Sequence, residues 1–576
     1  MEMRKSTRSV EGVPAGSSDK SRRTYLKLLG AGGLAGLAGC QGGGSSNDGT
    51  ATDSSGGDTT THDSGGDDSG EELYGGTIRI AIPQTLNNLH PMKGVSATDY
   101  AFAEVMYSRL TVLHPDDTTA QPDLATDWEA NNNVDEWTFM LNEDATFVGG
   151  DPVTASDVAA TVDYMMNDDE LPTADRFLGG ATGADVVDEK TVTINLDGPD
   201  TEYPRRISET GSSFNIVPKS VIDDDPSKMS DRSFGSGPFT LKEKSGGNKY
   251  VFDARDDYWG VDEDGDEIPY VDQMAMTVVS DSLAATNGLV DQRYDAVLQA
   301  DPTMKSRYEQ GEQTQMYSHE SMELINILLN TDIEPFDNPN VRKALKYAMD
   351  KEAMLEAIEG RGSLGYHHSV SPLHKLYADD IDDPFGDTAQ PEKARALLEE
   401  EGYSGDTLLE LPTLPFSKGS TPEKEPQAQL FQQQMAAAGI EFDLQLITTD
   451  TWLTDYWNKD EAWYFSGWAA RAVETSVLEL GFHSESSWNS ARFDNAEYDK
   501  HLEAAMNATD METKRKELKE AQQILHVDGP WLVTTFVNIF GAWNDYVKDV
   551  ELPFTNERSY HHDARLTEDA PMGPSP

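Results

Sequence analysis

The sequence predicts an α/β protein with two or more lobes, and three observations carry that prediction. Residues 325–329 form a short apolar run typical of a buried strand, and a helical pattern follows it. Residues 428–438 suit a helix that Gly439 ends, and residues 440–447 alternate like a strand, a pair that suits an α/β lobe. Of the 576 residues, about 500 follow the polar N-terminal part, which is enough chain for more than one hydrophobic core.

The stretch after the first of these strands predicts two successive helices. Asn338 is placed to cap a helix whose first residue is Pro339, where a missing backbone N–H costs nothing. Apolar residues then recur at helical spacing. Asp350 is placed to cap a second helix, Lys351 to Ile358, which Gly360 ends.

The first 40 residues resemble an export signal with a lipidation site. Arg22 and Arg23 form a twin-arginine motif. The apolar stretch Leu28 to Gly39 is too short to span a bilayer, which takes about 20 helical residues. It ends at Cys40, the only cysteine of the chain, which stands where a lipobox carries its lipid-accepting cysteine. We expect twin-arginine export and lipidation of Cys40; the alternative is a plain secretion signal with an incidental cysteine.

Residues 41–72 predict a flexible, solvated tether. They are almost wholly Gly, Ser, Thr and Asp, so they cannot bury apolar surface. Signal, lipid anchor and tether together place the folded body at the extracellular face of the cell membrane. No later segment is apolar enough to span a membrane, and a single cysteine excludes an internal disulfide framework.

The chain is strongly acidic, with 103 Asp and Glu against 45 Lys and Arg and a formal net charge of −58. Nucleic acid is excluded as a partner, because its phosphates would be repelled. The acidic residues are spread along the chain rather than gathered in one tail. This favours a solvated surface of the kind that halophilic proteins carry, where salt screens self-repulsion; a surface tuned to bind cations is the alternative.

The first part of the folded body predicts mainly strands. Residues 75–83 alternate as a strand that ends in proline, and residues 100–113 suit a helix. After a strand at 137–141 and a turn, Thr154 is placed to cap a helix with Asp157 in its first turn.

Later segments continue the mixture of strands and helices. The glycine-rich turn at 234–241 matches neither a phosphate-binding loop nor a nucleophile elbow. Residues 270–279 predict a strand, residues 391–401 and 512–526 predict helices, and residues 530–540 are apolar and rich in β-formers.

Several of these segments resemble one protein family. The run N-T-x-x-x-P-F-D-x-P-x-V-R-x-A-L-x-Y-A-M-D-K-E, which begins at Asn330, resembles the opening of the second lobe in family 5 solute-binding proteins. These are the dipeptide, oligopeptide and nickel receptors of ABC importers. Further resemblances, in the family's order, are Gly75–Ala81, Ala145–Val158, Phe234–Leu241 and Asp257–Gly260.

The resemblance covers nearly the whole chain after the tether and implies its domain organisation. The expected fold is a two-lobed, class II periplasmic-binding-protein fold with an extra subdomain in lobe I. The implied boundaries are residues 1–40 for the signal, 41–72 for the tether, 73–318 for lobe I, 319–532 for lobe II, and 533–576 for the return to lobe I and the C-terminal tail.

The resemblance also points to a ligand-contacting loop. Peptide-binding members carry G-W-x-x-D at a strand end, where the tryptophan lines the pocket, nearby backbone pairs with an extended peptide and the aspartate holds the ligand's α-amino group. Gly467 and Trp468 match, whereas Arg471 replaces the aspartate and favours an anionic or hydrogen-bond-accepting ligand group. Ala469 lies between them, and Glu474 is the candidate substitute for the aspartate. These five residues are the predicted ligand-binding set; the alternative for Trp468 is a core aromatic.

The expected function is that of a non-catalytic receptor. Two lobes close over a small-molecule or peptide ligand, foremost a dipeptide or oligopeptide, and deliver it to ABC permease subunits. An oligosaccharide or a metal chelate stays open as the ligand, and a tethered secreted hydrolase is the rival of another class. No Ser-His-Asp order, catalytic carboxylate pair or cofactor fingerprint supports an enzyme. Adjacent His367 and His368 lack a third ligand at metal-binding spacing, so we expect no metal site. We also expect that the protein binds no cofactor and is a monomer.

Overall fold

The computed structural model describes residues 72–73, 75–94, 96–114, 118–168, 171, 178–208, 214–262, 265–417, 421–550, 552 and 563–571. The export signal with Arg22 and Arg23, the lipidation site Cys40 and the tether up to residue 71 lie outside the described residues. Within the described part of the chain, no helix combines the length and the apolar character needed to cross a membrane.

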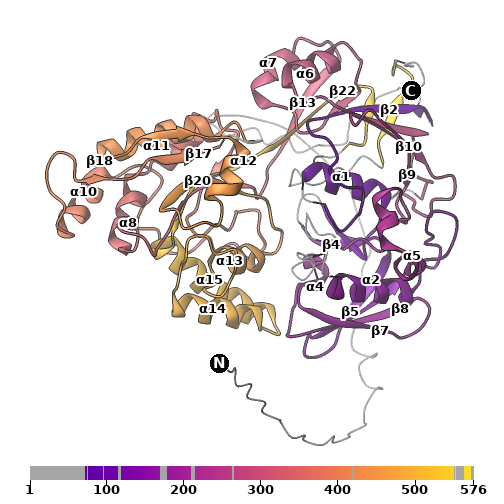
Figure 1. Ribbon diagram of the computed structural model, residues 1–576, viewed down its shortest axis with the longest axis horizontal. Helices are drawn as coiled ribbons and strands as arrows, with labels where there is room; N and C mark the ends of the chain where they lie inside the picture. Colours follow the sequence, from indigo (N-terminus) through magenta and orange to yellow (C-terminus); the bar gives the residue numbers. More distant parts are fainter. Residues whose placement is uncertain are drawn as a thin grey trace, which may run out of the picture. The chain divides into compact units, whose positions relative to one another are not determined.

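A seven-stranded mixed sheet forms the centre of what we call lobe I (Figure 1). Its middle strand, β2, is the strand predicted at 75–83 and runs parallel to β11 and β12, while the other pairs are antiparallel. In spatial order the strands are β13 (Thr314–His319), β22 (Ile539–Asn544), β12 (Ala296–Val297), β2 (Thr77–Ile82), β11 (Gln273–Val278), β10 (Lys249–Ala254) and β9 (Phe239–Ser245). The nearby helices are α1 (Ala97–Met106), α6 (Ser282–Val290), η2 (Pro302–Met304) and α7 (Lys305–Tyr308).

A four-stranded antiparallel sheet with helix α2 forms the predicted extra subdomain of lobe I. Its strands are, in spatial order, β5 (Ala125–Ala130), β6 (Glu136–Leu141), β8 (Thr191–Leu196) and β7 (Ala181–Val186). The capping prediction for α2 (Ala155–Asn167) is confirmed, because Asp157 Oδ2 accepts hydrogen bonds from both the backbone and the hydroxyl of Thr154. Short elements complete the region: β3 (Thr111–Leu113), β4 (Ala120–Pro122), α4 (Tyr203–Arg206), α5 (Lys219–Asp224) and η1 (Pro226–Ser230).

The helix predicted at 100–113 is wrong in its second half. Helix α1 starts earlier, at a capping box formed by Ser96 and Asp99, and ends at Met106. Tyr107 is extended, and strand β3 then pairs with β4. Pairing with a distant strand therefore overrides the local helical pattern, as the β-branched Thr111 and Val112 allow.

Lobe II is built on a second four-stranded sheet, with the order β15 (Gly362–Leu364), β21 (Trp531–Val537), β14 (Leu324–Leu329) and β20 (Trp463–Trp468). Every pair of neighbouring strands in this sheet is antiparallel. The predicted caps are confirmed: Asn338 accepts from Asn340 N at the start of α8, and Asp350 accepts from Ala353 N at the start of α9. The helices are α8 (Pro339–Ala348), α9 (Lys351–Ala357), α10 (Pro391–Glu400), α11 (Lys424–Ala437), α12 (Thr449–Thr451), the π-helical η3 (Trp452–Tyr456), α13 (Glu474–Phe482), α14 (Ala496–Met506) and α15 (Met511–Asp528).

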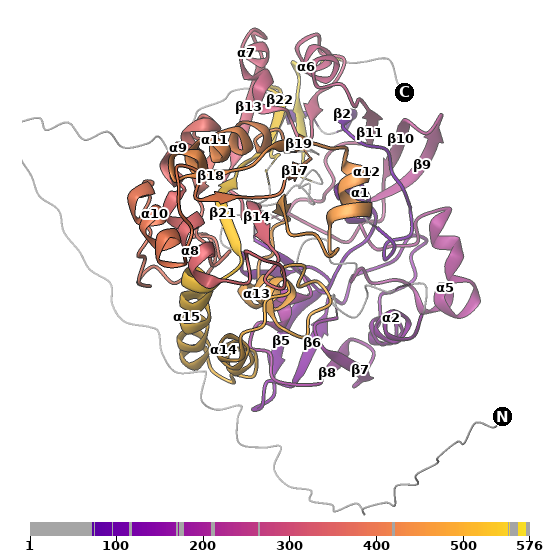
Figure 2. The same ribbon diagram turned by 60° about the vertical axis from the view of Figure 1, so that its left-hand side comes forward.

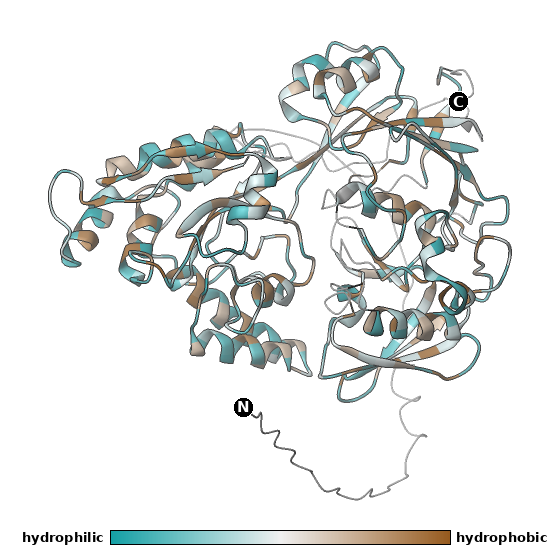
Figure 3. Cartoon of the chain, in the orientation of Figure 1, coloured by the Kyte–Doolittle hydropathy of each residue, from teal (hydrophilic) through white to brown (hydrophobic). Residues whose placement is uncertain are grey.

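The sheet of lobe II is buried on both faces. Trp463 and Phe465 of β20 join one apolar core, and Tyr464 and Trp468 join the other, as the period of two in a strand requires. The helices around the sheet carry both hydrophobic and hydrophilic residues along their length (Figure 3). The strand predicted at 440–447 forms two short pieces instead, β18 (Ile440–Glu441) and β19 (Leu444–Leu446), which run parallel to β16 (Leu409–Glu410) and β17 (Leu414–Phe416).

The chain passes between the two main sheets twice. It leaves β13 and enters β14 through residues 320–323, and it returns from β21 to β22 through Asn538. Because β13 pairs with β22 and β14 pairs with β21, the two crossings run side by side and antiparallel (Figures 1 and 2). A small sheet of β1 (Glu72–Leu73), β24 (Arg565–Thr567) and β23 (Val547–Lys548) joins the two ends of the described chain. The two-lobed α/β fold predicted from the sequence is confirmed.

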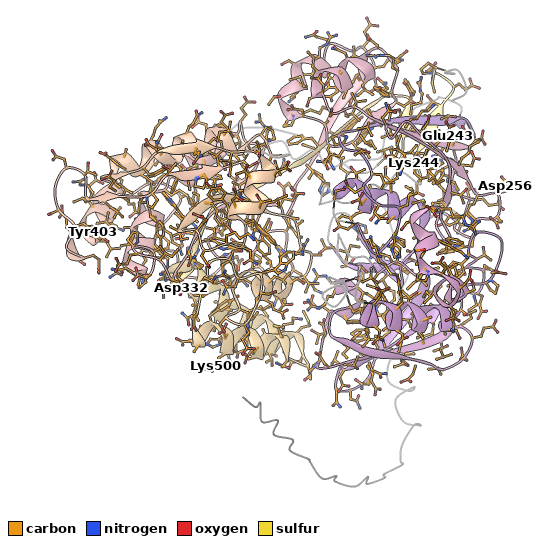
Figure 4. All side chains as sticks on the ribbon, viewed as in Figure 1. Glu243, Lys244, Asp256, Asp332, Tyr403 and Lys500 are labelled. Atoms are coloured by element: carbon orange, nitrogen blue, oxygen red, sulfur yellow. The ribbon has the colours of Figure 1, made fainter. Side chains whose placement is uncertain are left out.

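Charged side chains cover the outside of both lobes. Figure 4 labels five exposed charged residues: Glu243, Lys244 and Asp256 in lobe I, and Asp332 and Lys500 in lobe II. Exposed charges of this kind are solvated and contribute little to stability one by one.

Candidate functional site

Strand β20 ends at the predicted ligand loop and lies at the edge of its sheet. The amide of Asn330 donates to the carbonyl of Ala462 at 2.8 Å, so the residue pairs of β14 and β20 alternate from there between hydrogen-bonded and non-hydrogen-bonded. Gly467 lies opposite Ile325 and falls in the non-hydrogen-bonded class. Its N–H and C=O therefore point away from β14, towards the outer edge of the sheet, where no other described strand pairs with β20.

The side chain of Lys424, from helix α11, lies against Gly467 where a Cβ atom would project. A Cβ atom at Gly467 would lie 3.0 Å from the Leu324 carbonyl oxygen, 3.2 Å from Lys424 Cε and 3.3 Å from Lys424 Nζ. Only glycine allows this approach without displacing a neighbour. Lys424 is the first residue of α11, far from Gly467 in the sequence, and sequence analysis did not identify it.

The ammonium group of Lys424 is held in a poorly solvated place. Burial lowers its pKa to about 8, although the nearby carboxylates of Glu323 and Glu423 act in the opposite direction. No described residue forms a hydrogen bond or ion pair with Nζ. Glu423 Oε1 instead faces Arg361 Nε at 3.4 Å.

Arg471, in the loop after β20, is a second cation near Gly467. Its side chain is half-buried, and Nη1 donates to the carbonyl of the adjacent Ala470 at 3.0 Å. No carboxylate among the described residues pairs with it. Its backbone is fixed by His374: the Ser371 amide donates to Nδ1, which leaves the ring proton on Nε2 to donate to the Arg471 carbonyl at 2.7 Å.

Trp468 lies in an aromatic cluster, with only 8% of its surface exposed. Its ring centroid is 4.9 Å from that of Trp531 and 6.1 Å from that of Trp488. The indole therefore contributes to the core of lobe II, and its contact with ligand remains a prediction. Ala469 follows it and is half-buried.

Glu474 has partners of its own and is fully buried. Oε1 accepts a hydrogen bond from the Leu376 amide at 2.7 Å, and Oε2 lies 3.8 Å from Arg205 Nη1 in lobe I. Arg205 also donates from Nη2 to the carbonyl of Ala472 at 2.7 Å. These contacts connect the ligand loop to lobe I, so the structure engages Glu474 in a link between the lobes.

Glu474 and Arg205 belong to a larger set of buried charges, which we call the interlobe charge cluster. Lys514 Nζ of α15 lies 3.1 Å from Glu202 Oε2 and 3.7 Å from Asp200 Oδ1. Arg205 pairs with Glu202, and Arg206 Nε lies 2.6 Å from Asp200 Oδ2. The cluster consists of Asp200, Glu202, Arg205 and Arg206 from lobe I and Glu474 and Lys514 from lobe II.

The charges of this cluster stabilise one another. Burial disfavours ionised Asp200 and Glu202, but the cations outweigh it and lower the pKa of both carboxyl groups, Arg206 and Lys514 for Asp200, Lys514 and Arg205 for Glu202. Arg206 extends the contact by donating to Ser476 Oγ at 2.9 Å and to Thr475 Oγ1 at 3.0 Å. The two lobes thus meet at α4 and α13 through polar and charged groups, away from the crossing strands.

The paired histidines are buried rather than exposed. The ring centroids of His367 and His368 lie 5.6 Å and 5.8 Å from that of His526, and His526 Nε2 lies 2.9 Å from Asp383 Oδ1. Across the residues that the structure describes, no three histidine, cysteine or acidic side chains are arranged to hold a metal ion. The rings of His367, His368 and His526 therefore pack together in the buried interior of lobe II.

Comparisons with known proteins agree with this architecture. Residues 119–489 match the family described as bacterial extracellular solute-binding proteins, family 5 Middle. The chain is similar to heme-binding protein A of Haemophilus influenzae, with 25% identity over 499 residues that cover 81% of this chain and 88% of the relative. It is also similar to the dipeptide-binding protein of Escherichia coli, with 23% identity over 490 residues that cover 80% and 89%.

Solved structures show the same fold. The oligopeptide-binding protein AppA of Bacillus subtilis, in complex with a nonapeptide, superimposes with a TM-score of 0.70 at 20% identity, over 86% of this chain and 100% of that structure. NikZ of Campylobacter jejuni, in complex with Ni(L-His), superimposes with a TM-score of 0.69 at 17% identity, over 84% and 97%. The family's members are substrate-binding receptors of ABC transporters and not enzymes, and since the match covers more than half of the sequence, the chain belongs to the family 5 extracellular solute-binding proteins.

Proposed function

We propose that this receptor captures a dipeptide or short oligopeptide between its lobes and delivers it to the permease of an ABC importer. Relatives that are named for peptide binding cover most of the chain, which supports the ligand class. The single observation that carries the proposal is the open edge of β20 at Gly467.

An extended peptide can pair with that edge as an added strand. Gly467 presents its N–H and C=O outward, and main-chain groups of this kind bind any extended peptide regardless of its side chains. Arg471 then lies four residues beyond Gly467 as a half-buried cation, which favours a ligand that carries an acidic or hydrogen-bond-accepting group.

Two other ligand classes have precedents among the similar proteins. One relative is named for heme and one structure holds Ni(L-His). A metal chelate would be favoured by a cluster of ligating side chains near the loop, and among the described residues no three histidine, cysteine or acidic side chains are grouped to hold a metal ion. An oligosaccharide would gain little from the outward backbone groups of a strand edge, so a peptide is the better fit.

Capture requires the lobes to move about the two crossing strands. The interlobe charge cluster supports this step, because Arg205 contacts Ala472 and Glu474, which follow the ligand loop directly. A ligand that orders residues 467–471 therefore acts on the same segment that contacts lobe I, and closure traps it.

We propose that the receptor lies outside the cell membrane as a lipid-anchored monomer that is exported by the twin-arginine route and adapted to high salt. Cys40 and the polar tether support the anchor, Arg22 and Arg23 support the route, and the net charge of −58 supports the salt adaptation. Cys40→Ser should release the protein from the membrane fraction, and Arg22→Lys with Arg23→Lys should block export. Unchanged fractionation and export would contradict these two points.

Mass spectrometry of ligand that co-purifies under native high-salt conditions tests the proposed function. We expect intact peptides of a few residues, and calorimetric titration of the stripped protein with the same synthetic peptides should reproduce binding. Recovery of a sugar or a metal complex, with no peptide binding, would replace the peptide by that ligand.

A further inference from the structure

The turn between helices α14 and α15 (Figure 1) carries a motif that the receptor function does not use. Asn507, Ala508 and Thr509 form an N-x-[ST] sequon, the acceptor motif of N-linked glycosylation in exported proteins, and its middle residue is not proline. We infer that Asn507 is an N-glycosylation site, and that it takes an oligosaccharide from a lipid-linked donor outside the cell membrane. The inference rests on the proposed location of the receptor and is independent of its ligand.

The sequence contains this motif once. Of all asparagines in the 576 residues, Asn507 alone has a serine or threonine two residues further on. Replacement of this one side chain therefore removes every N-linked glycan that the sequence predicts, so a variant of Asn507 gives an unambiguous answer.

The structure exposes both side chains that the transferring enzyme must reach. Asn507 ends α14 and Asp510 caps α15, so the sequon lies in the connection between two helices rather than inside one. Asn507 and Thr509 are exposed, whereas Ala508 between them is only 5% exposed. The buried methyl group of Ala508 holds the turn against the protein and leaves the two polar side chains of the motif in solvent.

The amide group of Asn507 can take a sugar without losing its present hydrogen bond. Its Nδ2 donates to the Glu503 carbonyl at 2.7 Å, near the end of α14. An asparagine amide carries two hydrogens, so the sugar replaces one and the other keeps this bond. Oδ1 faces lobe I, where a Cβ atom at Gly198 would lie 3.6 Å away, an ordinary contact distance. The glycan would therefore stand at the rim of the region where the lobes meet.

The modification is a group transfer that needs no change in oxidation state. Nδ2 of Asn507 forms a bond to C1 of the first sugar, and the bond between C1 and the oxygen of the lipid phosphate breaks. The lipid phosphate leaves with the electron pair of that bond, and the amide gives one proton to a base of the oligosaccharyltransferase. The donor is a polyprenyl-phosphate- or polyprenyl-diphosphate-linked oligosaccharide, and the hydroxyl of Thr509 is the second group of the sequon that the transferase recognises.

Export in the folded state makes exposure of the sequon a requirement. The twin-arginine route proposed for this chain carries proteins that have already folded. A transferase on the outer side of the membrane then meets the finished fold and reaches only asparagines at its surface. Asn326 and Asn544 are fully buried and lie beyond its reach. Asn507 meets the requirement, because the motif and the exposure coincide at one turn.

The test uses the full-length protein from the cells that naturally produce it, with the variants expressed in the same cells. Mass spectrometry of the proteolytic peptide that contains residue 507 should show a mass increase equal to a sum of sugar residues, together with sugar fragment ions. Asn507→Gln and Thr509→Ala should lose the added mass completely, whereas Thr509→Ser, which keeps the hydroxyl group, should retain it. Thermal melting of all three variants should stay close to that of the chemically deglycosylated wild type, because the substitutions lie in an exposed turn.

An export-deficient variant separates failure of the site from failure of the location. The double variant Arg22→Lys with Arg23→Lys, if retained inside the cell, should carry no glycan. An exported wild type whose peptide around residue 507 is found only unmodified would overturn the inference and leave the proposed location intact. Added sugar mass that survives in Asn507→Gln would overturn it as well. A wild type that stays inside the cell would instead contradict the proposed location, and the inference with it.

Discussion

The interlobe charge cluster and the pair Lys424 and Arg471 differ in what neutralises their positive charges. In the cluster, three cations and three carboxylates from both lobes lie within 4 Å of opposite charges. Beside the end of β20, neither Lys424 of α11 nor Arg471 of the ligand loop has a carboxylate partner among the described residues. Buried charges that the chain satisfies itself hold parts of the fold in place, whereas charges that it leaves unsatisfied are available to a ligand.

The difference predicts opposite results for the same kind of substitution. Removing one member of a paired cluster leaves its partners buried and uncompensated, which costs more than the pair contributes. Removing an unpaired cation removes a desolvation cost and leaves no orphaned charge. Replacing a cation should therefore damage the fold in the cluster and affect only ligand binding beside the end of β20.

The largest effect is expected for Lys514→Met. Glu202 and Asp200 would lose a common cation in a buried place, so the free energy of unfolding should fall by about 3–5 kcal/mol. Denaturant titration in high salt measures this. Lys516→Met on the same helix, whose side chain is 74% exposed, is the control and should leave stability unchanged. Equal behaviour of the two variants would mean that the cluster does not support the fold.

Trp468→Ala tests the ligand loop from its buried side. Trp468 packs against Trp531 and is 8% exposed, so its truncation should lower the free energy of unfolding by about 3 kcal/mol. Trp468→Phe should recover part of the loss. Normal melting of Trp468→Ala together with lost peptide binding would instead identify a pocket residue, as the sequence resemblance implies.

Acid should destabilise lobe II through its buried histidines. Burial, followed by the charge of Lys346 for His367 and of His526 for His368, lowers the pKa of both rings well below 6.5. The unfolded chain therefore binds protons that the folded chain does not, so stability is full above pH 6.5 and falls below it. Once the pH is below 6.5, each histidine lowers the free energy of unfolding by about 1.4 kcal/mol per pH unit, so the two rings together cost about 3 kcal/mol between pH 7.5 and 5.5.

Urea unfolding at a series of pH values measures this loss. His367→Phe should reduce the loss between pH 7.5 and 5.5 by about 1.4 kcal/mol, and its ring nitrogens have no hydrogen-bond partner in the described structure that a phenyl ring would break. A pH profile that is the same in this variant and the wild type would assign the acid sensitivity to other groups.

Local signals in the sequence predicted the parts of the fold that depend on neighbours along the chain. The caps at Asn338, Asp350 and Thr154 need only a side chain and the next turn of helix, and all three are present. The helix expected at 100–113 failed because strand β3 is defined by its pairing with β4, which no local pattern reveals. The two-lobed fold followed from the order of the family segments, not from any single element.

The residues of the candidate site fall into the same two groups: those that the local sequence predicts and those that only the fold brings together. The position of Gly467 at a strand end could be inferred from the resemblance. The approach of Lys424 to Gly467 and the contact of Arg205 with Glu474 join residues far apart in sequence, and no spacing or composition signals them. The expectation that Glu474 replaces the missing aspartate came from proximity in sequence, whereas its buried carboxylate is directed to Leu376 and Arg205 in the fold.

The smallest change in stability and the sharpest test of ligand choice are expected for Arg471→Asp. The side chain of Arg471 is half-buried, and among the described residues its guanidinium bonds only to the adjacent Ala470 carbonyl, so melting should change little. The new carboxylate would stand where peptide-binding relatives of the G-W-x-x-D type carry their aspartate, and it should favour peptides with a free α-amino group over N-acetylated ones. Titration with matched free and acetylated peptides measures this preference, with Arg471→Gln as the neutral control. If Arg471→Asp keeps the wild-type ligand profile, the charge at this position does not choose the ligand, and the choice lies with other groups beside the end of β20.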